Sequence, residues 1–168
     1  GRGKGYNVNV PLPAKTGDEV SMWAFEKVFI PLTTSFKPDI VITVLGADGL
    51  FSDPFSNLEL TNIGYSQAVQ MIVDHSPKLL ALGGGGYVPE NMARTWTLEW
   101  TIMNGLGCRE EDNASFGGVF WGDGVCSLQD SSLFIPDDIR AANRRDLEST
   151  IAAIRKNVFP LHGIRARG

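Results

Sequence analysis

The sequence predicts an α/β fold built on a mostly parallel sheet. Short apolar segments rich in β-branched residues alternate with segments of helical periodicity, which is the pattern of strand–helix–strand units. The apolar segments are nearly continuous, as in strands that a parallel sheet buries on both faces. The 168 residues, 43% of them hydrophobic, suffice for one domain or for part of a larger one.

Three segments are expected to be strands. Residues 6–10 alternate between polar and apolar side chains and stop at a proline. Residues 40–45 are nearly all β-branched, and residues 79–82 form a shorter apolar run that ends at a glycine. A small parallel sheet needs helices on both faces and protected edges. The chain starts on a strand with almost no lead-in, which we expect for the middle of a domain.

The first two helices are expected over residues 17–36 and 61–75. The first has an apolar side and contains Pro31, which we expect to kink it. The second begins at Thr61, a residue type that caps helix N-termini. Its inward-facing residues are expected to be Ala68, Met71 and Ile72.

Two further helices are expected over residues 89–104 and 142–158. The earlier one begins with proline and glutamate, which favour a first helical turn. Residues 105–137, rich in Gly, Asp and Ser, are expected to be irregular. The last helix has an apolar stripe at helical spacing, made of Leu147, Ile151, Ile154 and Val158.

The net charge of −4 argues against a general nucleic-acid binder, because phosphate-binding surfaces are basic. The charge is uneven along the chain: residues 140–168 carry a net +5 and residues 1–139 a net −9. The basic end could contact an acidic partner or RNA. We favour the simpler interpretation, in which these cations form the solvated face of the last helix.

Cysteine usage and hydropathy indicate the compartment. No apolar run reaches the ~18 residues of a membrane span, and no secretory signal is visible at the N-terminus. The two cysteines, Cys108 and Cys126, form neither a CxxC pair nor a disulfide framework. We therefore expect a cytoplasmic protein with reduced thiols and no membrane partner.

A first candidate for chemistry lies where the second predicted strand ends, because ligands of open α/β sheets bind beyond the carboxyl ends of strands. Asp48 stands two residues past Gly46, and a carboxylate there can bind a cation or orient a base. The alternative, that Asp48 caps the turn, is favoured by position alone. Asp53, which precedes a proline, is expected to serve the turn.

A second candidate follows the third predicted strand, where four glycines (83–86) precede Tyr87. Glycines let the main chain approach a ligand closely, and a phenol can donate a hydrogen bond to a developing oxyanion. A flexible loop with a packing aromatic is one alternative. A phosphate cradle is another, which the lack of a GxxxxGK[ST] motif weakens.

Hydrolysis by a side-chain nucleophile has little support, because no GxSxG motif occurs. The two histidines, His75 and His162, lie away from the predicted strand ends, and we expect surface or capping roles for both. No HExxH or Asp-x-His pattern occurs, so the sequence shows no three-ligand zinc site of its own.

Several motifs, in order, resemble the zinc-dependent histone deacetylase family, nearest its prokaryotic members such as acetoin-utilisation proteins and acetylpolyamine amidohydrolases. The matching segments are GKGYNVNVP (3–11), GAD through DP (46–54), LT (60–61), GGGGY (83–87) and ARTWT (93–97). Order and spacing agree over residues 1–106 and less distinctly over residues 107–168. Residues 1–168 thus resemble the C-terminal portion of a single deacetylase domain.

The resemblance implies an arginase-like, three-layer α/β fold with a mostly parallel sheet, of which the N-terminal half would be absent here. It also implies hydrolysis of acetyl-lysine-type amides by a zinc-activated water. The substrate would be an acetylated lysine, a polyamine or a small acetyl-amide.

The resemblance also implies roles for individual residues. Asp48 would be one of three zinc ligands, and Tyr87 would hydrogen-bond the substrate carbonyl. Gly85 would line the acyl pocket with its backbone. Phe55 falls where the family usually has Leu or Met on the substrate tunnel wall, which implies a narrower tunnel. Tyr6 matches a residue whose carbonyl helps hold a structural monovalent cation in some members.

The family's histidine pair, its other two zinc ligands and its paired tunnel aromatics all precede the GKG segment. We therefore expect this chain to be inactive alone and to need the missing N-terminal half or a second chain. The alternative is a non-catalytic binding or structural protein derived from the same fold, which the uneven charge and an open sheet edge suggest. A nucleotide-binding domain would rest on the glycines alone.

Overall fold

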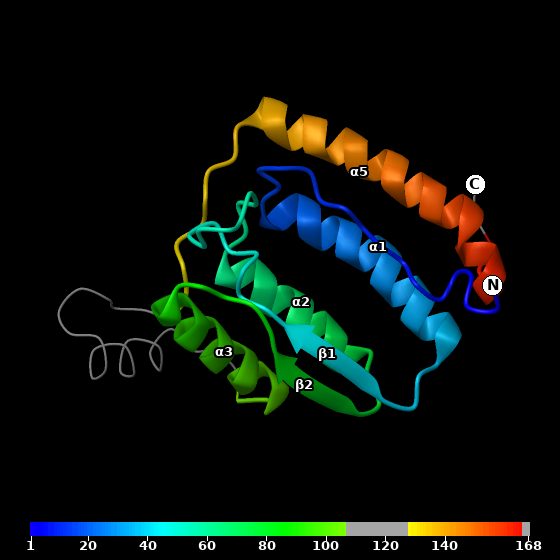
Figure 1. Ribbon diagram of the computed structural model, residues 1–168, viewed down its shortest axis with the longest axis horizontal. Helices are drawn as coiled ribbons and strands as arrows, with labels where there is room; N and C mark the ends of the chain where they lie inside the picture. The colour runs from blue at the N-terminus through cyan, green and yellow to red at the C-terminus, as the bar shows by residue number, and fades with distance from the viewer. Residues whose placement is uncertain (107–127, 166–168) are drawn as a thin grey trace.

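The computed structural model describes residues 1–106 and 128–165 (Figure 1). In these residues, two parallel strands carry a layer of helices, and one long helix packs on the outside of that layer. The elements are α1 (Asp18–Phe36), β1 (Val41–Leu45), α2 (Asn62–Asp74), β2 (Leu79–Gly83), α3 (Pro89–Met103), α5 (Asp137–Asn157) and the 3-10 helix η1 (Phe159–His162).

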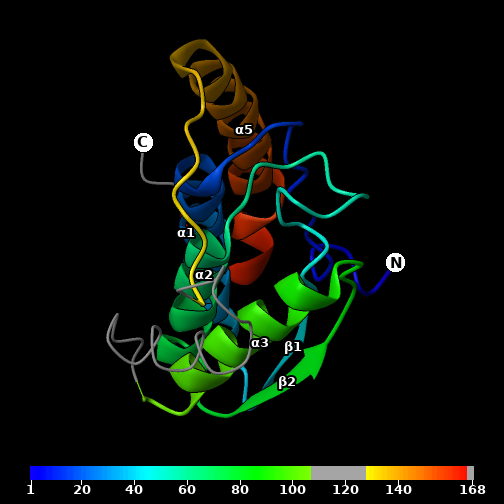
Figure 2. The ribbon, with the colours of Figure 1, turned by 90° about the vertical axis from the view of Figure 1, so that its left-hand side faces the viewer.

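The two strands pair in parallel, from Val41 opposite Leu79 to Leu45 opposite Gly83. Helix α2 connects them, α3 follows β2, and these helices pack against each other on one side of the sheet (Figure 2). This strand–helix–strand–helix order confirms the predicted α/β class and both predicted strands at 40–45 and 79–82.

The two faces of the sheet differ. Side chains that point toward the helices are half-buried or buried, whereas those that point away are exposed. The exposed face is apolar and consists of Ile42, Val44, Leu80 and Leu82, between 46% and 68% exposed. The expected cover of helices on both faces is therefore not found among the described residues. This apolar face is hereafter called the open face.

The main apolar core lies between α1 and α5, away from the sheet. Its members are buried and come from both helices and η1: Val20, Ala24, Val28, Leu147, Ile151, Ile154 and Phe159. The spacing of the α5 members repeats every three or four residues, as the sequence predicts. The cation of Arg144 lies 3.3 Å from the centre of the Trp23 ring and closes one side of this contact.

The prediction of a strand at residues 6–10 is wrong for the described structure. This segment is irregular, and no strand among residues 1–106 and 128–165 pairs with it. Its alternating Val8 and Val10 instead pack against the edge of the helical core. The alternation correctly indicates one-sided burial, but the buried side faces helices. A β-strand also requires a neighbouring strand that shares backbone hydrogen bonds with it.

Three of the predicted helices agree closely with the structure, and Pro31 lies inside α1. Thr61 caps α2 as predicted, because its hydroxyl accepts hydrogen bonds from the amides of Ile63 and Gly64. The inward face of α2 is shifted: Val69 and Ile72 are buried, whereas Ala68 and Met71 are only half-buried.

Helix α5 begins at Asp137, five residues before the predicted start, because two acidic residues there favour a first turn. Most of the segment predicted to be irregular, 105–137, lies outside the described residues, as do Cys108 and Cys126. Within the described part of the chain, no helix combines the length and apolar character of a membrane span.

Candidate active site

The loops that follow β1 and β2 meet at the carboxyl end of the sheet. The amide of Ala47, just after β1, donates a 2.7 Å hydrogen bond to the carbonyl of Gly85, just after β2. Helix α3 fixes the same end, since the indole of Trp96 donates to the Leu45 carbonyl at 2.9 Å and its ring lies on Gly83. These contacts place the two candidate loops side by side.

Asp48 projects from the first loop and is exposed. Its carboxylate lies directly against Gly85, so that a Cβ added at Gly85 would overlap the carboxylate oxygens. No hydrogen bond or ion pair within the described ranges holds this carboxylate. The expected alternative role, a turn cap, therefore has no supporting contact, and the carboxylate remains available to a ligand.

Gly85 accordingly has a structural reason to be glycine, namely the close approach of Asp48. Its neighbour Gly86 has a φ of +144°, a conformation that residues with side chains rarely adopt. The glycines therefore let the second loop pass close to Asp48 and then turn toward Tyr87.

Tyr87 stands at the end of the second loop with 58% of its surface exposed. Its ring packs edge-on against the ring of Phe55, with 4.7 Å between the ring centres. Phe55 belongs to the first loop and is 73% exposed. Four of the predicted site residues (Asp48, Phe55, Gly85 and Tyr87) are thus brought to one end of the sheet.

Asp53 joins the two loops, which the sequence did not suggest. Asp53 is buried, with only 5% of its surface exposed. One oxygen accepts a hydrogen bond from the Phe55 amide at 2.9 Å, and the other accepts one from the Tyr87 amide at 2.8 Å. The first contact is the turn role that the Asp-Pro pair predicts. The second contact joins the two loops, and no local pattern in the sequence predicts it.

The half-buried Tyr65 and the buried Glu99 are titratable groups near this end of the molecule. Burial raises the pKa of the Tyr65 phenol, and the negative charges of Glu99 and Asp48 raise it further. Burial also raises the pKa of Glu99 to about 8, and no described residue bonds its Oε1 atom. Both groups are therefore neutral near pH 7, and Asp48 lies close enough to influence Tyr65.

Tyr6 is not brought to this site. Its exposed ring packs edge-on against Phe36 and against His162, whose Nε2 lies 2.8 Å from the Gly5 carbonyl. A groove lined by Tyr6 is also lined by Val41 and Ile42, at the amino end of β1. Tyr6 therefore lies at the opposite end of that strand from Asp48, and its role in holding a monovalent cation stays a prediction.

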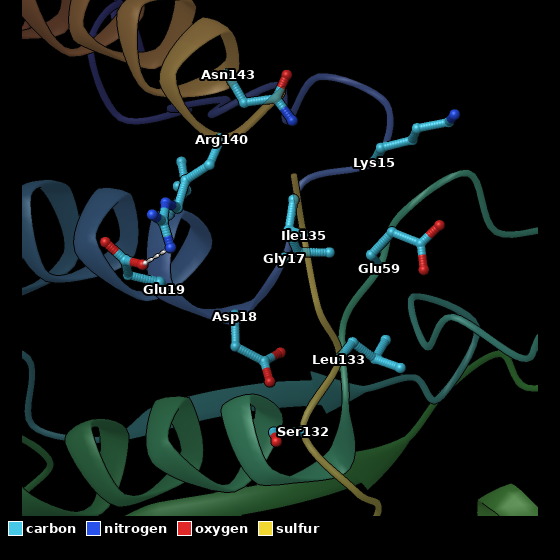
Figure 3. Close-up of a pocket in the computed structure, with 11 residues that line it drawn as sticks. Lys15, Gly17, Asp18, Glu19, Glu59, Ser132, Leu133, Ile135, Arg140 and Asn143 are labelled. Atoms are coloured by element: carbon cyan, nitrogen blue, oxygen red, sulfur yellow. Dashed lines mark hydrogen bonds and ion pairs between the residues drawn. The ribbon is translucent and has the colours of Figure 1, made fainter. Parts of the chain in front are cut away.

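A cavity of about 220 Å³ lies at the start of α1, and neither Asp48 nor Tyr87 lines it (Figure 3). Charges of both signs surround it, including the ion pair of Glu19 with Arg140. Asp18 turns toward α2, where it accepts hydrogen bonds from the amide and hydroxyl of Thr61 at 2.8 and 2.6 Å. This cavity thus lies where the first turns of α1 and α5 meet residues 132–135.

The residues at the sheet end fit zinc only in part. Asp48 offers an exposed carboxylate of the kind that zinc accepts as a ligand. Within residues 1–106 and 128–165, however, no three His, Cys, Asp or Glu side chains gather in a group that could hold a metal ion. Asp48 can therefore serve as one ligand of a zinc site, and further ligands must come from elsewhere.

Fold and site together define an α/β protein whose polar groups gather at the carboxyl ends of parallel strands. The sequence profile of the histone deacetylase domain matches residues 1–103, which is more than half of the chain. The chain therefore belongs to the histone deacetylase family. The motifs noted in the sequence resemblance lie within the matched range, so the expected family is confirmed.

Individual relatives agree with this assignment. The chain is 31% identical over 159 residues to histone deacetylase 8 of Danio rerio, covering 94% of this chain and 42% of that protein. It is 40% identical over 95 residues to a probable deacetylase of Archaeoglobus fulgidus, covering 54% of this chain and 26% of that protein. The chain thus spans less than half the length of the curated relatives it matches.

Solved structures confirm the fold. The chain is similar to an HDAC homologue in complex with SAHA, with a TM-score of 0.72 and 28% identity over 91% of this chain and 43% of that one. It is also similar to an HDAC homologue from Aquifex aeolicus, with a TM-score of 0.68 and 28% identity over 90% of this chain and 44% of that one. The expected arginase-like α/β fold is therefore confirmed.

Proposed function

We propose that this chain supplies two groups of a zinc-dependent deacetylase centre: Asp48 as a zinc ligand and Tyr87 as the donor to the substrate carbonyl. The observation that supports the proposal is their common position, since both side chains are exposed on touching loops at one end of the sheet. Parts of the deacetylase domain outside these 168 residues would supply the remaining ligands and the general base.

The reaction would be hydrolysis of an acetyl-amide, in an acetylated lysine, a polyamine or a small metabolite. The phenol of Tyr87 would donate a hydrogen bond to the carbonyl oxygen as negative charge develops there. Removing such a donor raises the barrier by roughly 3–4 kcal/mol in other enzymes. The exposed ring of Phe55, packed against Tyr87, would form one wall of the substrate channel, and the backbone of Gly85 would line the acyl end.

Zinc, when bound, lowers the pKa of a coordinated water and polarises the amide carbonyl. The contribution of this chain is the carboxylate of Asp48, which lies against the backbone of Gly85. One carboxylate ligand binds zinc weakly, so the chain by itself should neither retain the metal nor catalyse the reaction.

The open face and the edges of the sheet are where the rest of the domain would pack. The chain aligns with only 43% of the HDAC homologue that it resembles, so more than half of that chain has no counterpart in these 168 residues and would provide the cover. Parallel sheets are stable when helices cover both faces. The exposed Ile42, Val44, Leu80 and Leu82 are the residues that such cover would bury.

A chimera tests the proposal. This chain would replace the segment that it matches in the Aquifex aeolicus HDAC homologue, and hydrolysis of an acetyl-lysine peptide would be measured with and without zinc. We expect zinc-dependent turnover that Tyr87→Phe reduces by at least 100-fold. A folded, zinc-loaded chimera without turnover would contradict the proposal, as would turnover that is insensitive to Tyr87→Phe.

The second candidate function is a non-catalytic binding protein that uses the open face for a partner chain. The exposed apolar side chains of both strands favour it, because monomeric proteins rarely leave such a face uncovered. Light scattering of the purified chain separates the two candidates. A stable, monodisperse monomer without metal would support a self-sufficient binding module, whereas aggregation or folding only with a partner would support the deacetylase fragment.

A further inference from the structure

We propose that Asp53 is a positioning residue that sets the place of the Tyr87 phenol and of the Phe55 ring together. The inference rests on the proposed function, in which these two side chains face the substrate. Asp53 itself is buried and does not face the substrate, so it would act only through the two backbone amides that it holds.

The geometry assigns one carboxylate oxygen to each loop. Oδ1 accepts from the Phe55 amide at 2.9 Å within the first loop, and Oδ2 accepts from the Tyr87 amide at 2.8 Å in the second loop. The Asp53 amide donates in turn to the Leu50 carbonyl at 3.0 Å, which fixes the carboxylate within its own loop. A single side chain thereby links the backbone at Phe55 to the backbone at Tyr87, in addition to the hydrogen bond between Ala47 and Gly85 that also joins the two loops.

Burial makes this arrangement depend on the carboxylate. Asp53 is 5% exposed, and in the part of the chain that the structure describes no cation pairs with it. A buried carboxylate is tolerated when hydrogen bonds satisfy its oxygens. Here the two backbone amides provide these hydrogen bonds. An asparagine has one acceptor oxygen and an NH₂ group that cannot accept, so it can satisfy only one of the two loops.

The second loop is anchored before Tyr87 by the hydrogen bond from Ala47 to Gly85, but among the described residues Asp53 is the hydrogen-bond partner of Tyr87 itself. The four residues before it are glycines, which provide no side chains for packing, and the tyrosine ring is mostly exposed. The tyrosine ring packs against Phe55, whose amide the same carboxylate binds. The hydrogen bond to Asp53 therefore restrains the backbone at Tyr87 directly, at the residue that carries the phenol.

Amide signals of the 168-residue chain test the inference without requiring activity. In Asp53→Asn, we expect the Tyr87 or Phe55 amide proton to shift upfield by NMR and to exchange with solvent at least tenfold faster. The matched control is Asp18→Asn, because Asp18 also holds a backbone amide of a different segment, that of Thr61. The control should alter the Thr61 amide and leave Tyr87 unchanged.

Two NMR outcomes would overturn the inference. One is an unchanged Tyr87 and Phe55 amide in Asp53→Asn. The other is an equal change at Tyr87 in Asp18→Asn, which would mean that the effect is general loosening of the fold.

Activity of the chimera provides a second test, which can be used even if the isolated Asp53→Asn chain folds poorly. We expect Asp53→Asn to lower kcat by about 10- to 100-fold, because small misplacement of a catalytic group has this effect, and to leave zinc content unchanged. In a Tyr87→Phe background the same substitution should have little further effect on kcat. An equal loss in both backgrounds would show that Asp53 does not act through Tyr87. An inactive parent chimera would instead contradict the proposed function, while the amide signals still decide the role of Asp53.

Discussion

The contact between α1 and α5 and the sheet of β1 and β2 differ in how completely their apolar side chains are buried. Leu147 and Ala24 in the helical contact are fully buried, whereas Ile42 and Val44 on the open face are more than half exposed. Both regions contain apolar side chains, so the presence of such side chains does not by itself explain the difference. The helical core is complete within the described residues, and the sheet is not.

This difference separates stability from function. The helical core is a cluster of buried apolar side chains that stabilises the described structure. The candidate site, in contrast, lies on loops at the end of the incomplete sheet, where Asp48 and Tyr87 are exposed. We therefore expect large stability effects in the core and small ones on the open face.

The largest effect is expected for Leu147→Ala. Leu147 is fully buried between α1 and α5, and removing such a side chain leaves a cavity. We expect the free energy of unfolding to fall by about 2–5 kcal/mol, measured by urea denaturation. Arg145→Ala, on the exposed side of the same helix, is the control and should change it little. Similar small losses for both variants would contradict a complete core at this contact.

Glu99→Gln should change how stability depends on pH. The pKa of Glu99 is raised by burial from 4.5 to about 8, so the folded state holds a proton that the unfolded state releases. Stability from this group is complete below about pH 4.5 and is lost as the pH rises through about 8, by on the order of 1 kcal/mol per pH unit. Chemical denaturation between pH 5 and 8 should show a shallower decline in Glu99→Gln than in the parent chain. Parallel profiles would refute the raised pKa.

Thr61→Ala should have an intermediate effect on stability. It removes the cap of α2 and the hydroxyl that donates to Asp18 at 2.6 Å, which joins α2 to α1. We expect a loss of about 1–2 kcal/mol in the free energy of unfolding. Thr61→Ser retains the hydroxyl and should recover most of this loss. If the serine variant is as unstable as the alanine variant, the cap is not the cause.

The smallest effect is expected for Ile42→Thr on the open face. Ile42 is 62% exposed, and threonine keeps the β-branched shape that strands favour. The free energy of unfolding of this chain should change by less than about 0.5 kcal/mol. In the chimera, where the face would be covered, the same substitution should cost more. Equal effects in both proteins would mean that the rest of the domain does not pack on this face.

The fold was largely predictable because its helices and strands have local signals. Thr61 marks the start of α2, and the stripe of Leu147, Ile151 and Ile154 marks the buried side of α5. The strand prediction for residues 6–10 was wrong because alternation of polar and apolar residues indicates one-sided burial. It does not indicate whether a strand or a helix lies on the buried side. The open face could not be predicted either. The continuous apolar run at 40–45 predicts a strand that is buried on both faces, and it does not show whether this chain itself supplies the cover for each face.

The site was predictable where a residue follows a strand end. Asp48 and Tyr87 each come just after a predicted strand, so a parallel sheet brings them to one edge. Asp53 was assigned only to its turn, because its bond to the Tyr87 amide joins residues that are 34 positions apart. A contact of this kind depends on how two loops pack, and no local pattern in the sequence carries it.

The most direct test of the account compares zinc content and turnover in the chimera carrying Asp48→Ala or Tyr87→Phe. We predict that Asp48→Ala loses both zinc and turnover, whereas Tyr87→Phe retains zinc and loses turnover. Retention of zinc and turnover by Asp48→Ala, measured on folded protein, would contradict the claim that these two loops form one half of a zinc deacetylase centre.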